Sequence, residues 1–201
     1  VSVYDYDGKC SRPGLSGQEL MESVHGLADA YDVNLIEHSN IPGTQMTLDD
    51  AQSLAARIGG AMADDATRGV VVIQGTDTLE EIAFFIDLVS GHEKPVVFTG
   101  SMKSANALYS DAQGNIFGAA CVAACPEALD RGVLVYMKEQ IVSARDVAQT
   151  NTARIDSFQS CFGPGGAAVR GDRVVFLRAP DTTPAYDVGK LRARMPVHLA
   201  S

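Results

Sequence analysis

The stretch that decides the fold is GVVVIQGTDTLEEIAFFIDLV, residues 69–89. Its residues 70–73 are a run of β-branched side chains, which is too apolar for a strand with only one buried face. The apolar residues between 82 and 89 then recur at the spacing of an amphipathic helix. A buried strand that leads into such a helix is the repeating unit of a parallel sheet covered by helices.

Similar units precede and follow this stretch. Two earlier helices are predicted from capping boxes, one formed by Ser16 with Glu19 and one by Thr47 with Asp50. Apolar residues at helical spacing continue the first helix to residue 31, before the apolar run 33–36. Further apolar runs predict strands at 95–98 and 132–136 and a helix at 114–124. Because strands and helices alternate, the sequence predicts an α/β fold with a doubly wound, mainly parallel sheet.

The pattern changes after residue 137. A Gly and Pro turn at 163–166 is followed by two short strands, 167–169 and 174–177, which predict a C-terminal β-hairpin. From residue 180 the chain is polar and contains Pro, as is typical of a linker. We therefore expect one α/β domain over 1–179 and a linker over 180–201.

The charge balance excludes two classes of partner. The chain of 201 residues carries 16 Lys and Arg against 25 Asp and Glu, a net charge of −9. So acidic a surface does not attract nucleic acid or anionic lipid, and no apolar run approaches the roughly 20 residues of a membrane span. The opening segment 1–9 has no apolar core of a signal peptide, which favours a cytoplasmic location.

The metal-binding residue types are few and scattered. The four cysteines, at 10, 121, 125 and 161, lack paired zinc-site spacing. Cys121 and Cys125 stand four residues apart and are expected as small apolar side chains on a buried helix face. The histidines, at 25, 38, 92 and 198, form no ligand motif. We predict no metal.

Ligands of open parallel sheets bind where strands end and helices begin. That places interest on the loops 74–78, 99–114 and 143–152. In the first loop Gly75 permits a tight turn, and two hydroxyls flank the carboxylate of Asp77. Helix capping explains the same residues, through Asp77 with Glu80 or Thr78 with Glu81, at about 1 kcal/mol.

Four longer sequence strings are not explained by helix capping. They are QGTDTLEEIAFF at 74–85, KPVVFTGSM at 94–102 followed by Ser110-Asp111 and Asn115, RGVLVYM at 131–137, and SARDV at 143–147 with Thr150-Asn151-Thr152. In this order they resemble the N-terminal domain of the bacterial-type L-asparaginase/glutaminase family, from about Leu15 to about Pro180.

The resemblance implies that a threonine nucleophile removes ammonia from a small amino-acid amide, such as asparagine, without metal or cofactor. Thr76 resembles the family's second catalytic threonine, and Asp77 the carboxylate that binds the substrate's ammonium and couples to a lysine. Ser101 stands where a backbone carbonyl holds the side-chain amide, and Gln74 and Gly75 belong to the same binding string. A homo-oligomer, dimer or tetramer, is also implied.

Three departures from the family pattern concern the chemistry. The first strand, with the TGGTI string and primary nucleophile, is not in the sequence, and neither is the smaller C-terminal domain. We therefore expect a portion of a longer polypeptide. Gln149 stands at the catalytic lysine, and a neutral amide does not accept the threonine proton. Lys138 and Arg145 are two candidates for pairing with Asp77 instead.

The third departure lies in the substrate-binding loops. Gln74 replaces a histidine, and Gly43 replaces a serine that binds the substrate carboxylate. Thr44 either donates its hydroxyl from the next position or begins the helix cap at Thr47. Together the departures leave two hypotheses, an amidohydrolase and a non-catalytic amino-acid-binding or regulatory homologue.

Other residues have weaker functional interpretations. Tyr4 and Tyr6 fall in the family's lid region, and spacing assigns neither of them. Ser101 and Lys103 suggest a dyad by adjacency alone. Glu80 and Glu81 stand in a first helical turn, where they are expected to complement the helix dipole.

Overall fold

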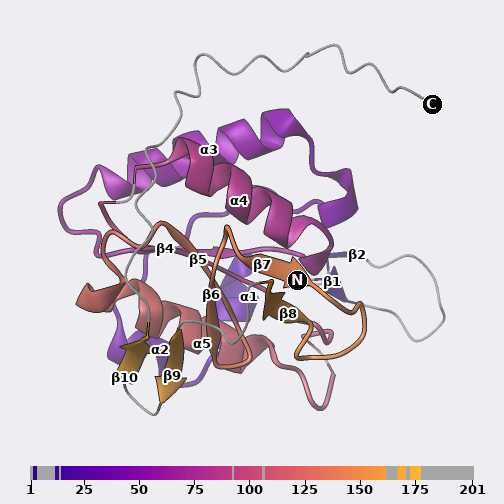
Figure 1. Cartoon of the computed structure of the whole chain (residues 1–201). Coiled ribbons are helices and arrows are strands. Elements are labelled where there is room, and N and C mark those ends of the chain that lie inside the picture. The colour runs from indigo at the N-terminus through magenta and orange to yellow at the C-terminus, as the bar shows by residue number, and fades with distance from the viewer. Residues whose placement is uncertain are drawn as a thin grey trace.

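A computed structural model (Figure 1) describes residues 2–3, 12–13, 15–91, 93–105, 107–161, 167–170 and 173–177. The helices are α1 Gly17–Glu22, α2 Leu27–Ala30, α3 Leu48–Met62, α4 Leu79–Val89 and α5 Ala112–Ala123, with 3₁₀ turns η1 Gly43–Gln45, η2 Thr76–Thr78 and η3 Pro126–Ala128. The strands are β1 Ser2–Val3, β2 Arg12–Pro13, β3 Val70–Ile73, β4 Val96–Thr99, β5 Val133–Met137, β6 Gln140–Ser143, β7 Val147–Gln149, β8 Phe158–Ser160, β9 Ala167–Arg170 and β10 Arg173–Phe176.

The main sheet has six strands in the order β10-β9-β6-β5-β4-β3. Strands β3, β4 and β5 are parallel, with Val70 opposite Val96 and Val96 opposite Val133. Strands β6, β9 and β10 add to them in antiparallel pairs. The α/β fold class is confirmed, since parallel strands linked by helices form one half of the sheet. The C-terminal hairpin is confirmed by the antiparallel pair β9 and β10.

Helices cover both faces of the sheet (Figure 1). On one face α3 and α4 pack against alternate strand residues such as Val96, Phe98 and Val133. On the other face α5 packs against Val97 and Leu134, and α1 and α2 pack against α5. Every residue of β4 and β5 is buried, as expected for strands covered on both faces.

Both capping boxes form as the sequence predicts. Ser16 accepts the N–H of Glu19, and Thr47 accepts the N–H of Asp50, while each carboxylate returns to the cap residue. The hydrogen bonds also lower the pKa of both Glu19 and Asp50.

The single helix expected from residue 17 to residue 31 is wrong. It breaks into α1 and α2 at Gly26, whose φ of 75° is left-handed and therefore suits glycine. The apolar run 33–36 that follows forms neither helix nor strand, and Val33, Leu35 and Ile36 are exposed by 40–42%. The predicted linker, 180–201, lies outside the described residues.

Residues 143–152, expected as a loop, contain strand β7 and begin at the end of β6. A two-residue turn at Lys138 and Glu139 makes β6 possible, since both have positive φ, 47° and 63°. Such a turn usually uses Asn or Gly, so the sequence did not signal it.

Candidate active site

The carboxyl ends of β3 and β4 bring two of the predicted loops together. Gln74 continues the parallel pairing by donating its N–H to the carbonyl of Thr99. A Cβ on Gly100 would lie 2.6 Å from the carbonyl oxygen of Gln74 and 3.5 Å from a methyl group of Thr76. A glycine at position 100 therefore allows the carbonyl of Gln74, at the end of β3, to lie so close to the end of β4.

Thr78 connects this turn to residue 43. Its hydroxyl donates to the carbonyl of Gly43 at 3.1 Å and accepts from the Gln74 amide nitrogen at 3.1 Å. Thr78 is the N-cap residue of α4 by position, yet its side chain makes no cap hydrogen bond. The capping interpretation of Thr78 is therefore wrong, because its hydroxyl binds a distant loop. That of Asp77 is wrong as well, since within the described residues its carboxylate accepts no backbone N–H.

Gly43 packs directly against Asp77. A Cβ on Gly43 would lie 3.3 Å from the Cβ of Asp77 and 3.6 Å from its Oδ2, so the two loops are in close contact. Asp77 itself is exposed. Within the described part of the chain, no hydrogen bond or ion pair engages its carboxylate. That leaves the carboxylate accessible to a ligand from solvent.

The loop after β4 is organised by Asp111. Its carboxylate accepts the N–H groups of Met102 and Lys103 at 3.1 and 2.9 Å, and it lies 2.8 Å from the Ser101 hydroxyl. The buried Asn115 amide donates both to Asp111 and to the carbonyl of Gly100, each at 3.0 Å. These bonds fix the backbone at 100–103, on which the role expected of Ser101 depends.

Gln149 reaches this loop from the other side. Its backbone N–H donates to the carboxylate of Glu80, and its side-chain nitrogen lies 3.8 Å from the sulfur of Met102. Gln149 is half-buried. Glu80 thus binds a residue of another segment, a contact that the helix-dipole interpretation did not anticipate.

The cations proposed to replace the family lysine lie elsewhere. The Arg145 guanidinium contacts the carboxylate of Asp87 at 2.6 Å. Lys138 is exposed. The pKa of Asp156 is lowered chiefly by its hydrogen bond with Arg154, and the charge of Lys138 contributes least to this lowering. Lys103 donates to the carbonyl of Ala153 at 2.9 Å, which leaves no support for a dyad with Ser101.

All but one of the predicted site residues lie in one cluster, and the exception is Thr44. Gln74, Gly75, Thr76 and Asp77 form the centre, Ser101 adjoins them through Gly100, and Gln149 adjoins Ser101 through Met102. Thr44 lies in η1 with an exposed side chain. Thr47 forms its own capping box, so capping gives Thr44 no role. Tyr4 and Tyr6 lie outside the described residues.

Sequence reasoning missed two carboxylates in this cluster. Glu80 stood in a string typical of a helix start, and its hydrogen bond to a residue far along the chain has no local signal. Asp111 was part of a matched motif without an assigned task. Both bind backbone N–H groups, and such contacts leave no pattern in the sequence.

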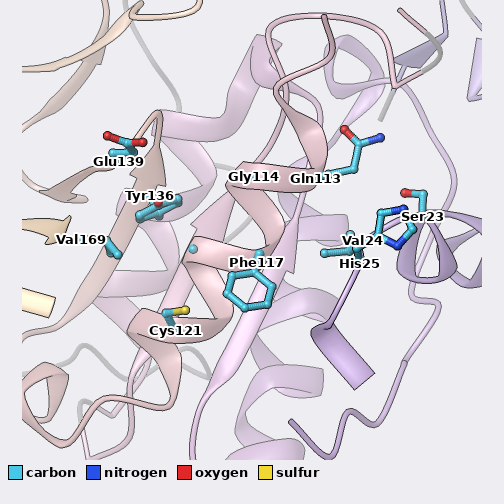
Figure 2. A pocket seen from close by; sticks show the side chains of 11 residues that line it. Ser23, Val24, His25, Gln113, Gly114, Phe117, Cys121, Tyr136, Glu139 and Val169 are labelled. Atoms are coloured by element: carbon cyan, nitrogen blue, oxygen red, sulfur yellow. The ribbon is translucent and has the colours of Figure 1, made fainter. Parts of the chain in front are cut away.

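A separate hollow of about 450 Å³ lies along α5. Figure 2 shows Glu139 and Tyr136 on one of its sides and Gln113, His25 and Ser23 on the other. Burial, assisted by the charge of Glu139, raises the pKa of Tyr136 to about 12. None of the predicted catalytic or substrate-binding residues lines this hollow.

The three cysteines that the structure describes, at 121, 125 and 161, form no metal site. Cys121 is half-buried on α5 and accepts a hydrogen bond from the Tyr31 hydroxyl at 3.3 Å. Cys125 is half-buried beyond the end of α5, so the two do not share a buried helix face. In the residues that the structure describes, no group of three or more His, Cys, Asp or Glu could hold a metal ion.

No described helix is long and apolar enough to cross a membrane.

Comparison with known proteins places the chain in a family. A family model described as "Asparaginase, N-terminal" matches residues 1–182. L-asparaginase 2 of Bacillus subtilis is 39% identical over 150 residues, which cover 74% of this chain and 40% of that protein. The probable L-asparaginase of Deinococcus radiodurans is 37% identical over 194 residues, which cover 93% of this chain and 59% of that protein.

A solved structure shows the same fold. The crystal structure of a probable cytoplasmic L-asparaginase from Campylobacter jejuni superposes with a TM-score of 0.81 at 30% identity, covering 88% of this chain and 56% of that one. The chain spans about half the length of such relatives. From the family model, the relatives and the shared fold together, the chain belongs to the asparaginase family and corresponds to its N-terminal domain.

Proposed function

We propose that this domain supplies the amide-binding half of an asparaginase-type active site, which releases ammonia from asparagine or a related small amino-acid amide. Thr76 assists the proton transfers, Asp77 binds the substrate's ammonium group, and the backbone at Ser101 binds its side-chain amide. The relatives named as L-asparaginases and glutaminase-asparaginases support this class of substrate.

The observation that carries the proposal is the accessible carboxylate of Asp77 at the meeting point of three loops. Gly43 packs against its Cβ, and Thr76 packs beside Gly100. A zwitterionic substrate needs an anion for its ammonium and several hydrogen-bond donors for its carboxylate. Asp77 supplies the anion. The hydroxyls of Thr76 and Thr44 are candidates for donors, from the turn beside it and from η1.

Hydroxyl nucleophiles need a base, and Gln149 does not provide one. Its amide can donate and accept hydrogen bonds, yet it takes no proton near neutral pH. We therefore propose that Gln149 orients other groups in the site and does not transfer protons. A slower reaction, or a preference for a substrate other than asparagine, is the expected consequence.

We propose that the primary nucleophile is delivered by a further strand beside β3. This strand is at the edge of the six-stranded sheet, and its four residues are only half-buried, whereas those of β4 and β5 are fully buried. Among the described strands, none pairs with the outer edge of β3, and an edge with half-buried β-branched residues is suited to pairing with another strand. If this further strand runs parallel to β3, its carboxyl end would lie next to Thr76.

The test is calorimetry combined with an ammonia-release assay on the full-length protein. Asparagine, glutamine and aspartate are titrated into the wild type and into Asp77→Ala, with Glu81→Ala as a control at an exposed position nearby. We expect binding and turnover in the wild type and the control, and loss of both in Asp77→Ala. Unchanged binding in Asp77→Ala would contradict the role of Asp77, and binding without ammonia release would favour the non-catalytic homologue.

A further inference from the structure

Two carboxylates of α4 hold the segment that carries Gln149. Glu80 and Asp87 stand at positions i and i+7, so they project from one face of the helix. Glu80 accepts the backbone N–H of Gln149, and Asp87 contacts the guanidinium of Arg145 at 2.6 Å. Helix α4 therefore binds both ends of the 145–149 segment.

The Asp87 contact is anchored in the core. Asp87 is 1% exposed, and its second oxygen accepts the N–H of Val133 at 2.7 Å. The N–H of Ala144 donates to the carbonyl of the same Val133 at 2.9 Å. Arg145 also lies over the ring of Phe84, with 6.0 Å between the guanidinium carbon and the ring centroid. The first end of the segment is thus fixed to the sheet independently of Glu80.

At the other end of the 145–149 segment, Glu80 accepts a backbone N–H that a neighbouring strand would otherwise accept. Strand β7 pairs with β8, with Gln149 opposite Phe158, and these two form a sheet separate from the main one. Thr150, the residue after β7, donates its N–H to the carbonyl of Ser157, the residue before β8. Because successive N–H groups of an antiparallel strand point to opposite sides, that of Gln149 points away from β8. The carboxylate of Glu80 receives it there.

We propose that Glu80 is a positioning residue of the active site, which holds the backbone of Gln149 so that its side chain stays beside Met102 and the loop after β4. A carboxylate makes a stronger acceptor for this N–H than a neutral carbonyl oxygen does. Glu80 needs no contact with substrate for this task. The inference rests on the proposed function, since it gives residue 149 a place in that site.

The neighbouring Glu81 shows that helix-dipole stabilisation does not explain this contact. Both carboxylates lie in the first turn of α4, where either would complement the dipole. Glu81 is exposed, and within the described residues no hydrogen bond or ion pair joins it to another segment. Glu81→Ala is therefore a matched control, since it removes the same charge from the same helical turn.

The kinetic test compares Glu80→Ala, Glu80→Gln and Glu81→Ala in the full-length protein, with asparagine as substrate. We expect Glu80→Ala to lower kcat about 100-fold with KM nearly unchanged, which is the scale of the effect when a residue that orients the reacting groups is displaced by about 1 Å. Glu80→Gln keeps an accepting oxygen and should stay within about tenfold of the wild type. Equal kcat in Glu80→Ala and Glu81→Ala would overturn the inference.

A double-mutant cycle separates positioning from general stability. The variant Gln149→Ala keeps its backbone N–H but loses the side chain on which Glu80 is inferred to act. In that background Glu80→Ala should lower kcat no further, although it still lowers the melting temperature. If Glu80→Ala lowers kcat by the same factor in both backgrounds, Glu80 does not act through residue 149.

Amide hydrogen exchange gives a readout that requires no turnover. Glu80→Ala should accelerate exchange at the Gln149 amide while exchange in β8 stays unchanged, and Glu81→Ala should accelerate neither. A wild-type protein that releases no ammonia would contradict the proposed function, and the exchange data would still test the Glu80 contact. Unchanged protection of Gln149 in Glu80→Ala would overturn the inference.

Discussion

The ring of Tyr136 lies directly on Gly118, so that a Cβ on Gly118 would stand 2.0 Å from the ring carbon Cζ. Both residues are buried, Gly118 on α5 and Tyr136 on β5. This contact sets how closely α5 packs on the sheet. It also brings α5 near the loop at 100–103, since Asn115 of the same helix binds Gly100 and Asp111.

Gly118→Ala should destabilise the protein. The methyl group forces the Tyr136 ring or the helix to move, and overpacking of this kind costs about 1–3 kcal/mol. Gly114→Ala is the matched control on the same helix, because a Cβ there meets no atom within 4 Å. It should raise stability by about 0.5–1 kcal/mol through helix propensity. Urea unfolding of both variants measures the difference, and equal effects would contradict the packing account.

Tyr136 should make stability depend on alkaline pH. Burial, together with the nearby charge of Glu139, raises its pKa from 10.0 to about 12 in the folded protein. A raised pKa means that the folded state binds the proton more tightly than the unfolded state does. The stabilisation is therefore complete below pH 10 and is lost as pH rises through 12. Tyr136→Phe should show a smaller loss of unfolding free energy between pH 9 and 11 than the wild type, and parallel curves would contradict this.

Asp87→Ala should be among the most destabilising single changes at the described polar positions. It leaves the partly buried Arg145 guanidinium without its carboxylate and the N–H of Val133 without an acceptor. Removal of one partner from a buried ion pair costs about 3–5 kcal/mol. Glu81→Ala, at an exposed position of the same helix, should change stability by less than about 0.5 kcal/mol. Chemical denaturation measures both, and a cost near that of Glu81→Ala would contradict a structural role for this pair.

Those parts of the fold whose signals are local could be predicted from the sequence. Capping boxes at Ser16 and Thr47, and β-branched runs such as 70–73, act within a few residues of chain. The break at Gly26 and the strand β6 could not be predicted in this way. A single glycine does not reveal that its φ is positive, and Lys138 with Glu139 does not resemble a usual two-residue turn.

The sequence indicated which loops form the candidate site, though not the contacts between them. The strings around Thr76, Ser101 and Gln149 indicated which loops matter, and the structure brings these loops together. From sequence alone, Thr78 and Glu80 have the pattern of residues that begin a helix. Both bind residues far along the chain, Gly43 and Gln149, because tertiary contacts compete successfully with local capping.

The most direct test of the central claim is the activity of Thr76→Ala in the full-length protein, with kcat from ammonia release and the dissociation constant of aspartate from calorimetry. The account predicts that kcat falls about 10²- to 10⁴-fold, the usual contribution of a group that assists proton transfer, while the dissociation constant of aspartate rises far less and the melting temperature stays nearly unchanged. A Thr76→Ala variant with wild-type turnover would contradict the account.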